Sequence, residues 1–174
     1  NNLVINKPGG SVTVGGSTTT LNVAKLTETA GDFNAPATLT ASGGITLDGG
    51  TYTAGNNTNI AGNFTKNGAT FVAGAGTVTM NGAGAQTIGG STSTSFQNLT
   101  TSNTTTTSIV ASGTGVSANL TISNGTTLSI STGNFSVTGT TLSGGGVSGT
   151  LQIANGGGTK TFVGGVTLNT GATW

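Results

Sequence analysis

The sequence predicts an all-β fold, a parallel β-helix (β-solenoid), on three observations. Short runs that alternate Thr or Ser with apolar residues recur along the whole chain, separated by glycine-containing turn dipeptides. Whole phrases return as well, since GGITLDGG at 43–50 reappears as GGVTLNTG at 164–171. Aromatic residues make up only 5% of the chain, whereas a β-sandwich core usually has more bulky anchors.

Each predicted strand is a run of three to six residues in which β-branched or aromatic residues alternate with small or polar ones. In chain order these runs are 3–6, 11–14, 20–24, 37–41, 45–47, 51–53, 63–65, 70–73, 77–80, 86–88, 96–100, 108–111, 120–123, 127–130, 135–138, 150–153, 161–163 and 166–168. Gly-Gly, Asn-Gly, Ser-Gly and Thr-Gly steps between them favour tight turns. The charged segment 22–30 is followed by Gly31, so we expect a loop or bulge there.

Alternation along these strands also predicts how the coils stack. Neighbouring strands of a sheet lie about 4.8 Å apart, so at about 20 residues per coil the chain forms about eight or nine coils and a stack about 40 Å long. The whole chain, 1–174, then forms a single domain. We expect Leu, Ile and Val inside and Thr and Ser outside. Most phenylalanines have the alternation of inward positions: Phe64, Phe71, Phe96, Phe135 and Phe162.

A second phrase places Asn before Leu or Phe and then a small or β-branched residue. It occurs as NLV at 2–4, NFT at 63–65, NLT at 98–100 and 119–121, and NFS at 134–136. Degenerate strand-and-turn units of this kind are typical of repeat proteins, in which each unit buries its apolar face only against its neighbours. The function is therefore expected to depend on a surface and a shape more than on a pocket.

Composition argues against several functional classes. Only 4% of residues are charged, the net charge is +1, and the chain contains no His and no Cys. The electrostatic footprint of nucleic-acid binding is missing, as are the residues of Ser/His/Asp or Cys/His catalysis and the usual zinc ligands. No apolar run reaches the roughly 18 residues that span a bilayer. We expect no enzyme activity, no cofactor, no membrane insertion in this segment, and a stability nearly flat in pH.

The acidic residues suggest one candidate metal or sugar site. Glu28, Asp32 and Asp48 are the whole acidic supply of the chain, and one predicted coil separates the first two from the third. Together they are candidate ligands for Ca²⁺, which prefers carboxylate oxygens. The alternative is that they are solvated turn residues, because Asn169 takes the place of Asp48 in the other copy of the phrase.

Aromatic and charged residues suggest a second candidate, a binding surface. Tyr52 and Trp174 occupy aligned or adjacent places in the two copies of the repeated phrase. With Lys25, Glu28 and Asp32 they are candidates for a surface on which sugars stack. Packing of the two aromatic rings in the core or at a junction is the alternative.

Residues 62–100 resemble repeats of large secreted and cell-surface proteins of bacteria. They contain in order a GNFT-like, a GTVT-like, a QTI-like and an FxNL-like strand, with 86–88 in the QTI place and Phe96, Asn98 and Leu99 in the FxNL place. The likeness is fair over 1–61 and loose over 101–174. These repeats are broadly similar to the β-helical passengers of filamentous adhesins and autotransporters. The resemblance implies a right-handed parallel β-helix in an extracellular, structural or adhesive protein, with no catalytic residues to transfer.

We therefore expect a structural and adhesive β-solenoid of a bacterial cell surface or extracellular filament. The chain starts and stops within repeat phrases, so we expect a segment of a longer repeat-containing or polymerising chain, which continues end to end. The expected partners are further copies, joined end to end or laterally, and cell-surface glycans. A carbohydrate-binding β-helix, or less readily a carbohydrate-cleaving one, is the alternative. An ice-binding solenoid is a further alternative, because Thr-x-Thr pairs recur, although unevenly along the chain.

Overall fold

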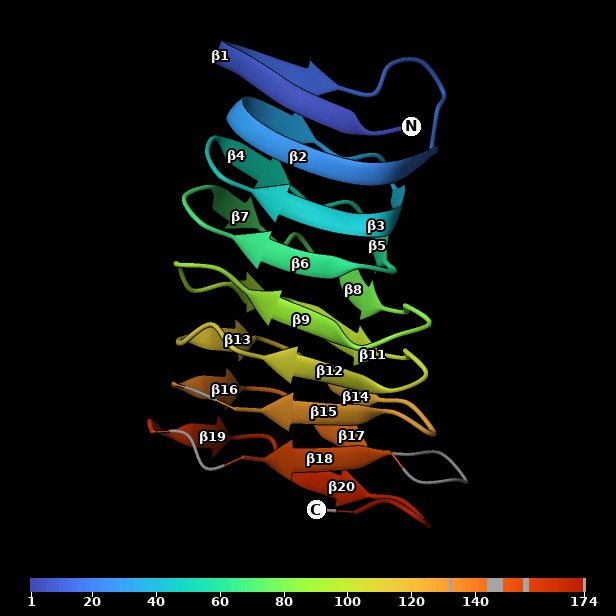
Figure 1. The fold of residues 1–174 in the computed structure, drawn as a ribbon, viewed down its shortest axis with the longest axis vertical. Helices are drawn as coiled ribbons and strands as arrows, with labels where there is room; N and C mark the ends of the chain where they lie inside the picture. The colour runs from blue at the N-terminus through green and yellow to red at the C-terminus, as the bar shows by residue number, and fades with distance from the viewer. Residues whose placement is uncertain (132, 144–148, 155–156, 174) are drawn as a thin grey trace.

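The computed structural model describes residues 1–131, 133–143, 149–154 and 157–173. Their strands wind into a parallel β-solenoid of about eight turns, and these residues contain no helix. In Figure 1 the front strands run to the left and the back strands to the right as the chain descends, which is the right-handed sense. The predicted fold class is confirmed.

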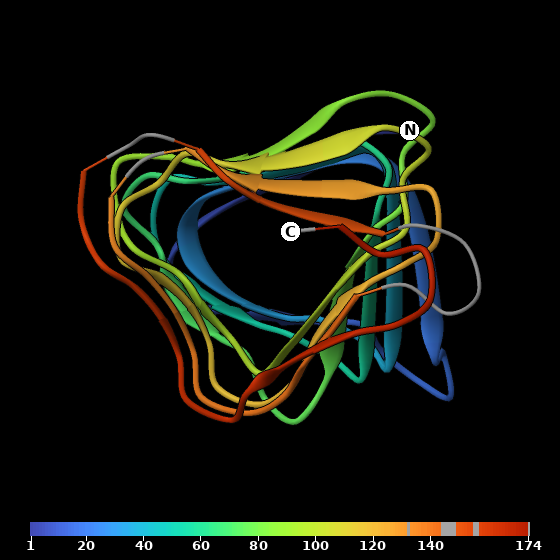
Figure 2. The ribbon, with the colours of Figure 1, turned by 90° about the horizontal axis from the view of Figure 1, so that it is seen from below.

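Long strands that bend around the corners form the first coils. They are β1 (Leu3–Thr13), β2 (Thr20–Asn34) and β3 (Thr38–Leu47), and in Figure 2 they curve around the axis of the solenoid. From β4 onward each strand is short and belongs to one of three walls, which we call A, B and C. The corners between walls give the cross-section its roughly triangular outline.

The three walls continue the three sides of the first coils. Wall A begins with the N-terminal parts of β2 and β3 and continues with β5 (Asn57–Ile60), β8 (Thr77–Met80), β11 (Asn98–Thr101), β14 (Leu120–Ile122), β17 (Thr141–Ser143) and β20 (Val166–Leu168). Wall B begins with the start of β1, the middle of β2 and the end of β3. It continues with β6 (Asn63–Lys66), β9 (Gln86–Gly89), β12 (Thr106–Ile109), β15 (Thr127–Ile130) and β18 (Thr150–Ile153). Wall C begins with the ends of β1 and β2. It continues with β4 (Thr51–Thr53), β7 (Thr70–Val72), β10 (Ser95–Phe96), β13 (Thr114–Val116), β16 (Phe135–Val137) and β19 (Lys160–Phe162).

Apolar ladders fill the interior because alternate residues of every strand point inward. In wall A, Leu39, Thr58, Val78, Leu99 and Leu120 follow one another in register and are all buried. Aromatic rings form a second continuous stack, in which the Tyr52 and Phe71 ring centroids lie 5.6 Å apart. The five phenylalanines predicted to point inward do so. Three of them are buried, and Phe71 and Phe162 are partly buried against the core.

Wall C is interrupted between β7 and β10, which do not pair. The coil at this point is longer, since Phe64 pairs with Ile88, 24 residues further on, whereas Ile88 pairs with Ile109, 21 residues further on. The additional chain forms a loop that Lys66 holds from inside. Its Nζ donates hydrogen bonds to Thr92 Oγ1 at 2.7 Å and to the Ala69 carbonyl at 3.1 Å.

The prediction of a loop at 22–30 was wrong in the main, because the whole segment lies in β2. The bulge that we gave as the other possibility is present as two register shifts, one between Val23 and Lys25 against β3 and one between Glu28 and Ala30 against β1. Two of the three charged side chains of β2, those of Lys25 and Asp32, are exposed, as outward positions on a strand allow. Glu28 is the exception, and it lies inside.

Candidate functional site

The three acidic residues do not form a site. Glu28 is fully buried inside the solenoid, Asp32 is exposed on wall C, and Asp48 is exposed at a corner, where its Oδ1 accepts a 2.7 Å hydrogen bond from Asn67 Nδ2. Among the described residues no three His, Cys, Asp or Glu side chains come together to hold a metal ion. The candidate Ca²⁺ site is therefore corrected: strand alternation directs Glu28 inward and leaves the other two acids outside.

The candidate surface for sugars is corrected in the same way. Tyr52 is fully buried and stacked on Phe71, so the alternative of core packing holds for it. Glu28 is likewise inaccessible, and Trp174 lies outside the described residues. Lys25 and Asp32 remain exposed, but they lie on walls B and C respectively.

Glu28 is a buried acid in an apolar interior. Neither of its carboxyl oxygens has a hydrogen-bond partner within the described part of the chain. Burial raises the pKa of Glu28 to about 7, a rise that the backbone N–H of Phe33 opposes and the charge of Asp32 reinforces. Burial also raises the pKa of nearby Tyr52 to about 12, and its hydroxyl lies 3.4 Å from Thr58 Oγ1. Both groups are inaccessible from outside the solenoid, so their ionisation affects the stability of the fold.

A shallow groove lies beside Lys25 on wall B. It has a volume of about 230 Å³, and its lining includes Lys25, Gly44 and Asn63. Lys25 is paired with Gly44 in the next coil, at a position where a side chain would not fit. A Cβ at Gly44 would lie 2.7 Å from the Asn63 carbonyl oxygen, and the φ of Gly44 is +131°. One flexible cation over a glycine provides a weak anion contact at most.

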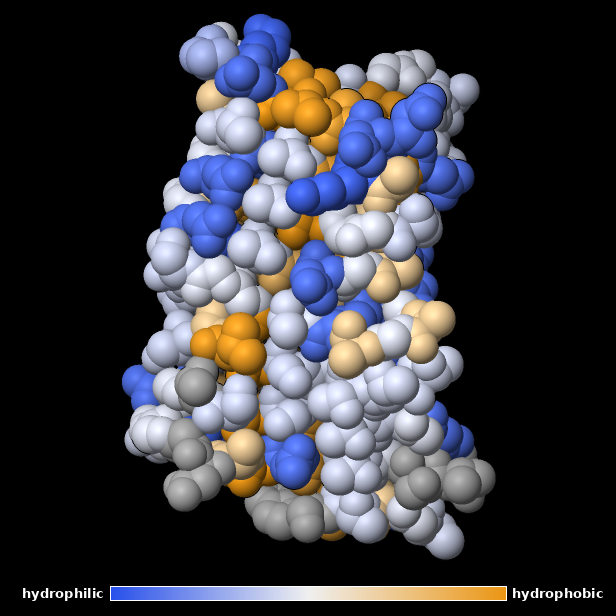
Figure 3. Space-filling view, in the orientation of Figure 1, coloured by the Kyte–Doolittle hydropathy of each residue, from blue (hydrophilic) through white to orange (hydrophobic). Residues whose placement is uncertain are grey.

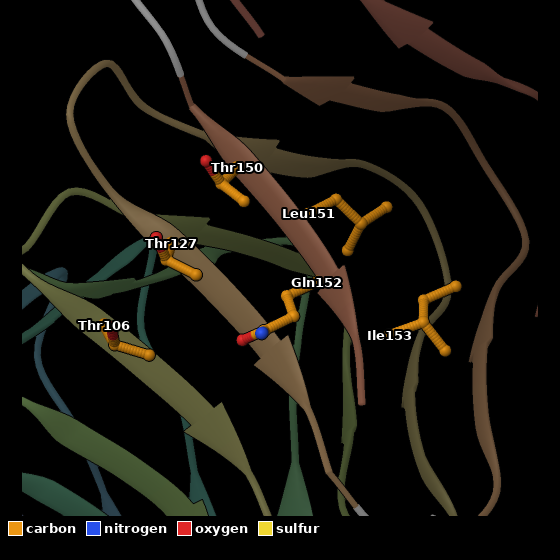
Figure 4. A pocket seen from close by; sticks show the side chains of 6 residues that line it. All are labelled: Thr106, Thr127, Thr150, Leu151, Gln152 and Ile153. Carbon is orange, nitrogen blue, oxygen red and sulfur yellow. The ribbon is translucent and has the colours of Figure 1, made fainter. Parts of the chain in front are cut away.

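A larger groove of about 550 Å³ lies near the C-terminal end of wall B. Figure 4 shows Thr106, Thr127 and Thr150 lined up across three successive strands, which agrees with their register in β12, β15 and β18. The described lining also includes Leu151, Gln152 and Ile153 of β18. The hydroxyl and amide groups of this lining can donate and accept hydrogen bonds.

Sequence reasoning missed the ordered outer surface of wall A. Thr-x-Thr pairs seemed irregular because the spacing of equivalent residues grows along the chain: Thr20 pairs with Thr38, Thr38 with Asn57, Asn57 with Thr77, and Thr77 with Asn98. The corners absorb the additional residues, and the strands remain in register. Treating Asn as equivalent to Thr at outward positions would have revealed the pattern.

No protein-family model matches the chain, and no curated protein or solved structure shows significant similarity to it. The described residues include no helix that is long and apolar enough to cross a membrane. The functional argument therefore depends on the geometry of the solenoid itself.

Proposed function

We propose that this chain is a stiff structural module of a bacterial cell-surface or extracellular protein, and that it extends by stacking end to end with further copies. The open ends of the solenoid carry the proposal. Within the described residues, β1 pairs only with β2, while β19 and β20 each pair on one side only. Such half-paired strands are templates for another strand.

Stiffness follows from the continuous ladders. A single sheet runs from β20 through wall A and back along wall B to β18, and each coil contacts its neighbours through hydrogen bonds and stacked side chains. In repeat proteins of this kind, stability is a sum of unit and interface terms, so each added coil extends the rod without a new core. This behaviour suits a stalk or filament.

Exposed apolar side chains support stacking at the ends. Ile153 and Leu168 in the last coils continue the inward ladders of buried Ile130 and Ser143. Both are nevertheless exposed, because no described coil covers them. Figure 3 shows apolar (orange) groups gathered near the N-terminal end, and smaller orange groups further down among a mostly pale surface. Apolar surface that remains in water favours contact with another surface of the same kind.

An extracellular, adhesive setting is supported by the resemblance of residues 62–100 to repeats of secreted bacterial proteins. Adhesion would then use the walls of the rod, and stacking would set its length. The chain has few charges, so long-range electrostatic steering contributes little to either contact.

Sedimentation velocity and negative-stain electron microscopy over a concentration series test end-to-end stacking. We expect wild-type rods to lengthen in whole multiples of one solenoid, about 40 Å at the strand spacing. The double variant Ile153→Lys/Leu168→Lys should remain at single length, because it places charge on the uncovered end of the core. The matched control Val72→Lys/Val110→Lys adds the same charge at exposed positions along the rod and should lengthen like wild type. Wild-type particles of single length at every concentration would contradict the proposal, as would equal behaviour of the two variants.

A further inference from the structure

We infer that the outer surface of wall A binds an ordered water lattice and, through it, ice. This inference goes beyond the structural role and does not depend on it. From β2 to the start of β14, every outward position on the strands of wall A is Thr or Asn. The positions are Thr20, Asn22, Thr38, Thr40, Asn57, Asn59, Thr77, Thr79, Asn98, Thr100, Asn119 and Thr121.

The strands set these side chains on a two-dimensional lattice. Outward residues on one strand are about 6.6 Å apart, and equivalent residues on neighbouring strands are about 4.8 Å apart. Pairing continues without a register shift through this part of wall A. Figure 2 shows the wall turning gradually along the rod, as twisted sheets do, so the lattice is most regular between neighbouring coils.

One row of this lattice makes no side-chain hydrogen bond to any residue that the structure describes. Within the described part of the chain, no hydrogen bond is formed by the side chains of Asn22, Thr40, Asn59, Thr79, Thr100 and Thr121. Their hydroxyl and amide groups are left for solvent, where each can both donate and accept. Thr is stiff about χ1 because it is branched at Cβ, so little conformational entropy is lost when water orders over it.

The neighbouring row holds the surface rigid. Asn98 Nδ2 donates a 3.2 Å hydrogen bond to the Gly76 carbonyl, and Asn98 Oδ1 accepts one of 3.2 Å from the Asn119 backbone N–H. In the next coil, Asn119 Oδ1 accepts a 2.7 Å hydrogen bond from Thr140 Oγ1. These bonds run along the rod axis and tie successive coils together beside the unpaired row.

The chemistry of the lattice favours water over other occupants. Its twelve side chains are uncharged, so phosphate groups of nucleic acid or lipid gain no ion pair there. None of them is aromatic, so sugar rings gain no stacking partner. A second copy packed on wall A would desolvate a dozen polar groups, each of which costs free energy unless it finds a partner. A water lattice satisfies them all, and bridging water is nearly as favourable enthalpically as a direct hydrogen bond.

The other walls lack this regularity, which provides an internal control. On wall B the equivalent rows are interrupted by Lys25, Gly44 and Gly89. Wall C is divided between β7 and β10. Wall B nevertheless has two short rows of threonine, one through Thr46 and Thr65 and one through Thr127. Thr46 and Thr65 are half-buried outward neighbours in successive coils, as Thr79 and Thr100 are on wall A.

Thermal hysteresis and inhibition of ice recrystallisation test the inference on the full chain. Wild type should show both. Thr79→Lys/Thr100→Lys should lose most of each, and the matched Thr46→Lys/Thr65→Lys should retain them, with circular dichroism showing both variants folded. Absence of both activities in wild type at high concentration would overturn the inference, as would equal loss in the two variants. Lateral association that Thr79→Lys/Thr100→Lys abolishes, without ice activity, would assign wall A to a second copy instead and would likewise overturn it.

Discussion

At the scale of single residues, asparagine explains the recurring Asn-Leu/Phe phrase. In three copies the Asn side chain accepts a backbone hydrogen bond from the next coil: Asn63 from Thr87, Asn98 from Asn119, and Asn134 from Thr159. The residue after each Asn is buried. These copies lie on walls B, A and C respectively. The phrase therefore marks a corner followed by a strand, and it occurs on all three walls.

This corner role predicts a stability effect. Asn98→Ala removes the hydrogen bond to the Gly76 carbonyl and leaves the Asn119 N–H without its acceptor. We expect the free energy of unfolding to fall by about 1–2 kcal/mol, measured by urea denaturation. Asn56 is exposed and its side chain makes no hydrogen bond to a described residue, so Asn56→Ala should change little. Equal losses in the two variants would argue against the corner role.

Glu28 makes stability depend on pH, which corrects the expectation of a nearly flat profile. Its pKa rises from 4.5 to about 7 in the fold, so the folded state binds the proton more tightly than the unfolded state. The stabilisation is therefore fully present below about pH 4.5 and is lost as pH rises through about 7, by at most about 3 kcal/mol. Denaturant titrations at pH 4.5 and 8 should show this loss.

A pair of variants isolates the group responsible for this dependence. Glu28→Gln keeps the shape and removes the titration, so its stability should be nearly the same at pH 4.5 and 8. Asp48→Asn, at an exposed acid, should keep the wild-type pH dependence. If Glu28→Gln lost stability with pH as steeply as wild type, another group would be the cause.

At the scale of elements, the break in wall C separates otherwise similar strands. β10 pairs with one strand only, β13 in the next coil, whereas β13 lies between β10 and β16. The Gly115 N–H donates to the Thr94 carbonyl at 2.9 Å, but no described strand offers an equivalent acceptor to β10. Ser95 is the residue of β10 in register with Gly115. Hydrogen exchange should therefore be faster for the Ser95 amide than for the Gly115 amide. Equal protection would indicate that β7 and β10 pair in solution.

Most strands could be predicted because their inward residues are apolar and their outward ones polar. The strands at 77–80, 127–130 and 150–153 have the predicted bounds. Three strands were missed: β5, β13 and β17. Thr58 lies in the core of β5, and β13 has Gly115 at its centre. In β17, Thr141 and Ser143 point inward and Leu142 is exposed. Within their ladders these polar residues lie between apolar ones: Thr58 lies between Leu39 and Val78, and Thr141 lies between Leu120 and Val166.

The candidate site could not be predicted for a related reason. Near Lys25 the strand register shifts, and this irregularity decides that Glu28 points inward. When the strand register is unknown, the three acids Glu28, Asp32 and Asp48 resemble a cluster. The outer row of wall A was missed for the opposite reason, since it becomes regular only once corners of different length are aligned.

At the scale of the whole molecule, every proposal depends on the register of successive coils. End-to-end stacking needs parallel ladders that remain open at the ends, and water ordering needs Thr and Asn side chains aligned across strands. The chain contains no Cys, so a pair of cysteines can be introduced without competition from native thiols.

Oxidation of paired cysteines tests this register most directly. Thr79 and Thr100 are opposite each other on neighbouring strands, about 4.8 Å apart, within the usual Cα separation for a disulfide. Thr79→Cys/Thr100→Cys should therefore form an intramolecular disulfide under mild oxidation. Thr79→Cys/Thr121→Cys places the thiols two coils apart, about 9.6 Å, and should remain reduced. Failure of the first pair to oxidise, or equal oxidation of the second, would contradict the solenoid register and the proposals that depend on it.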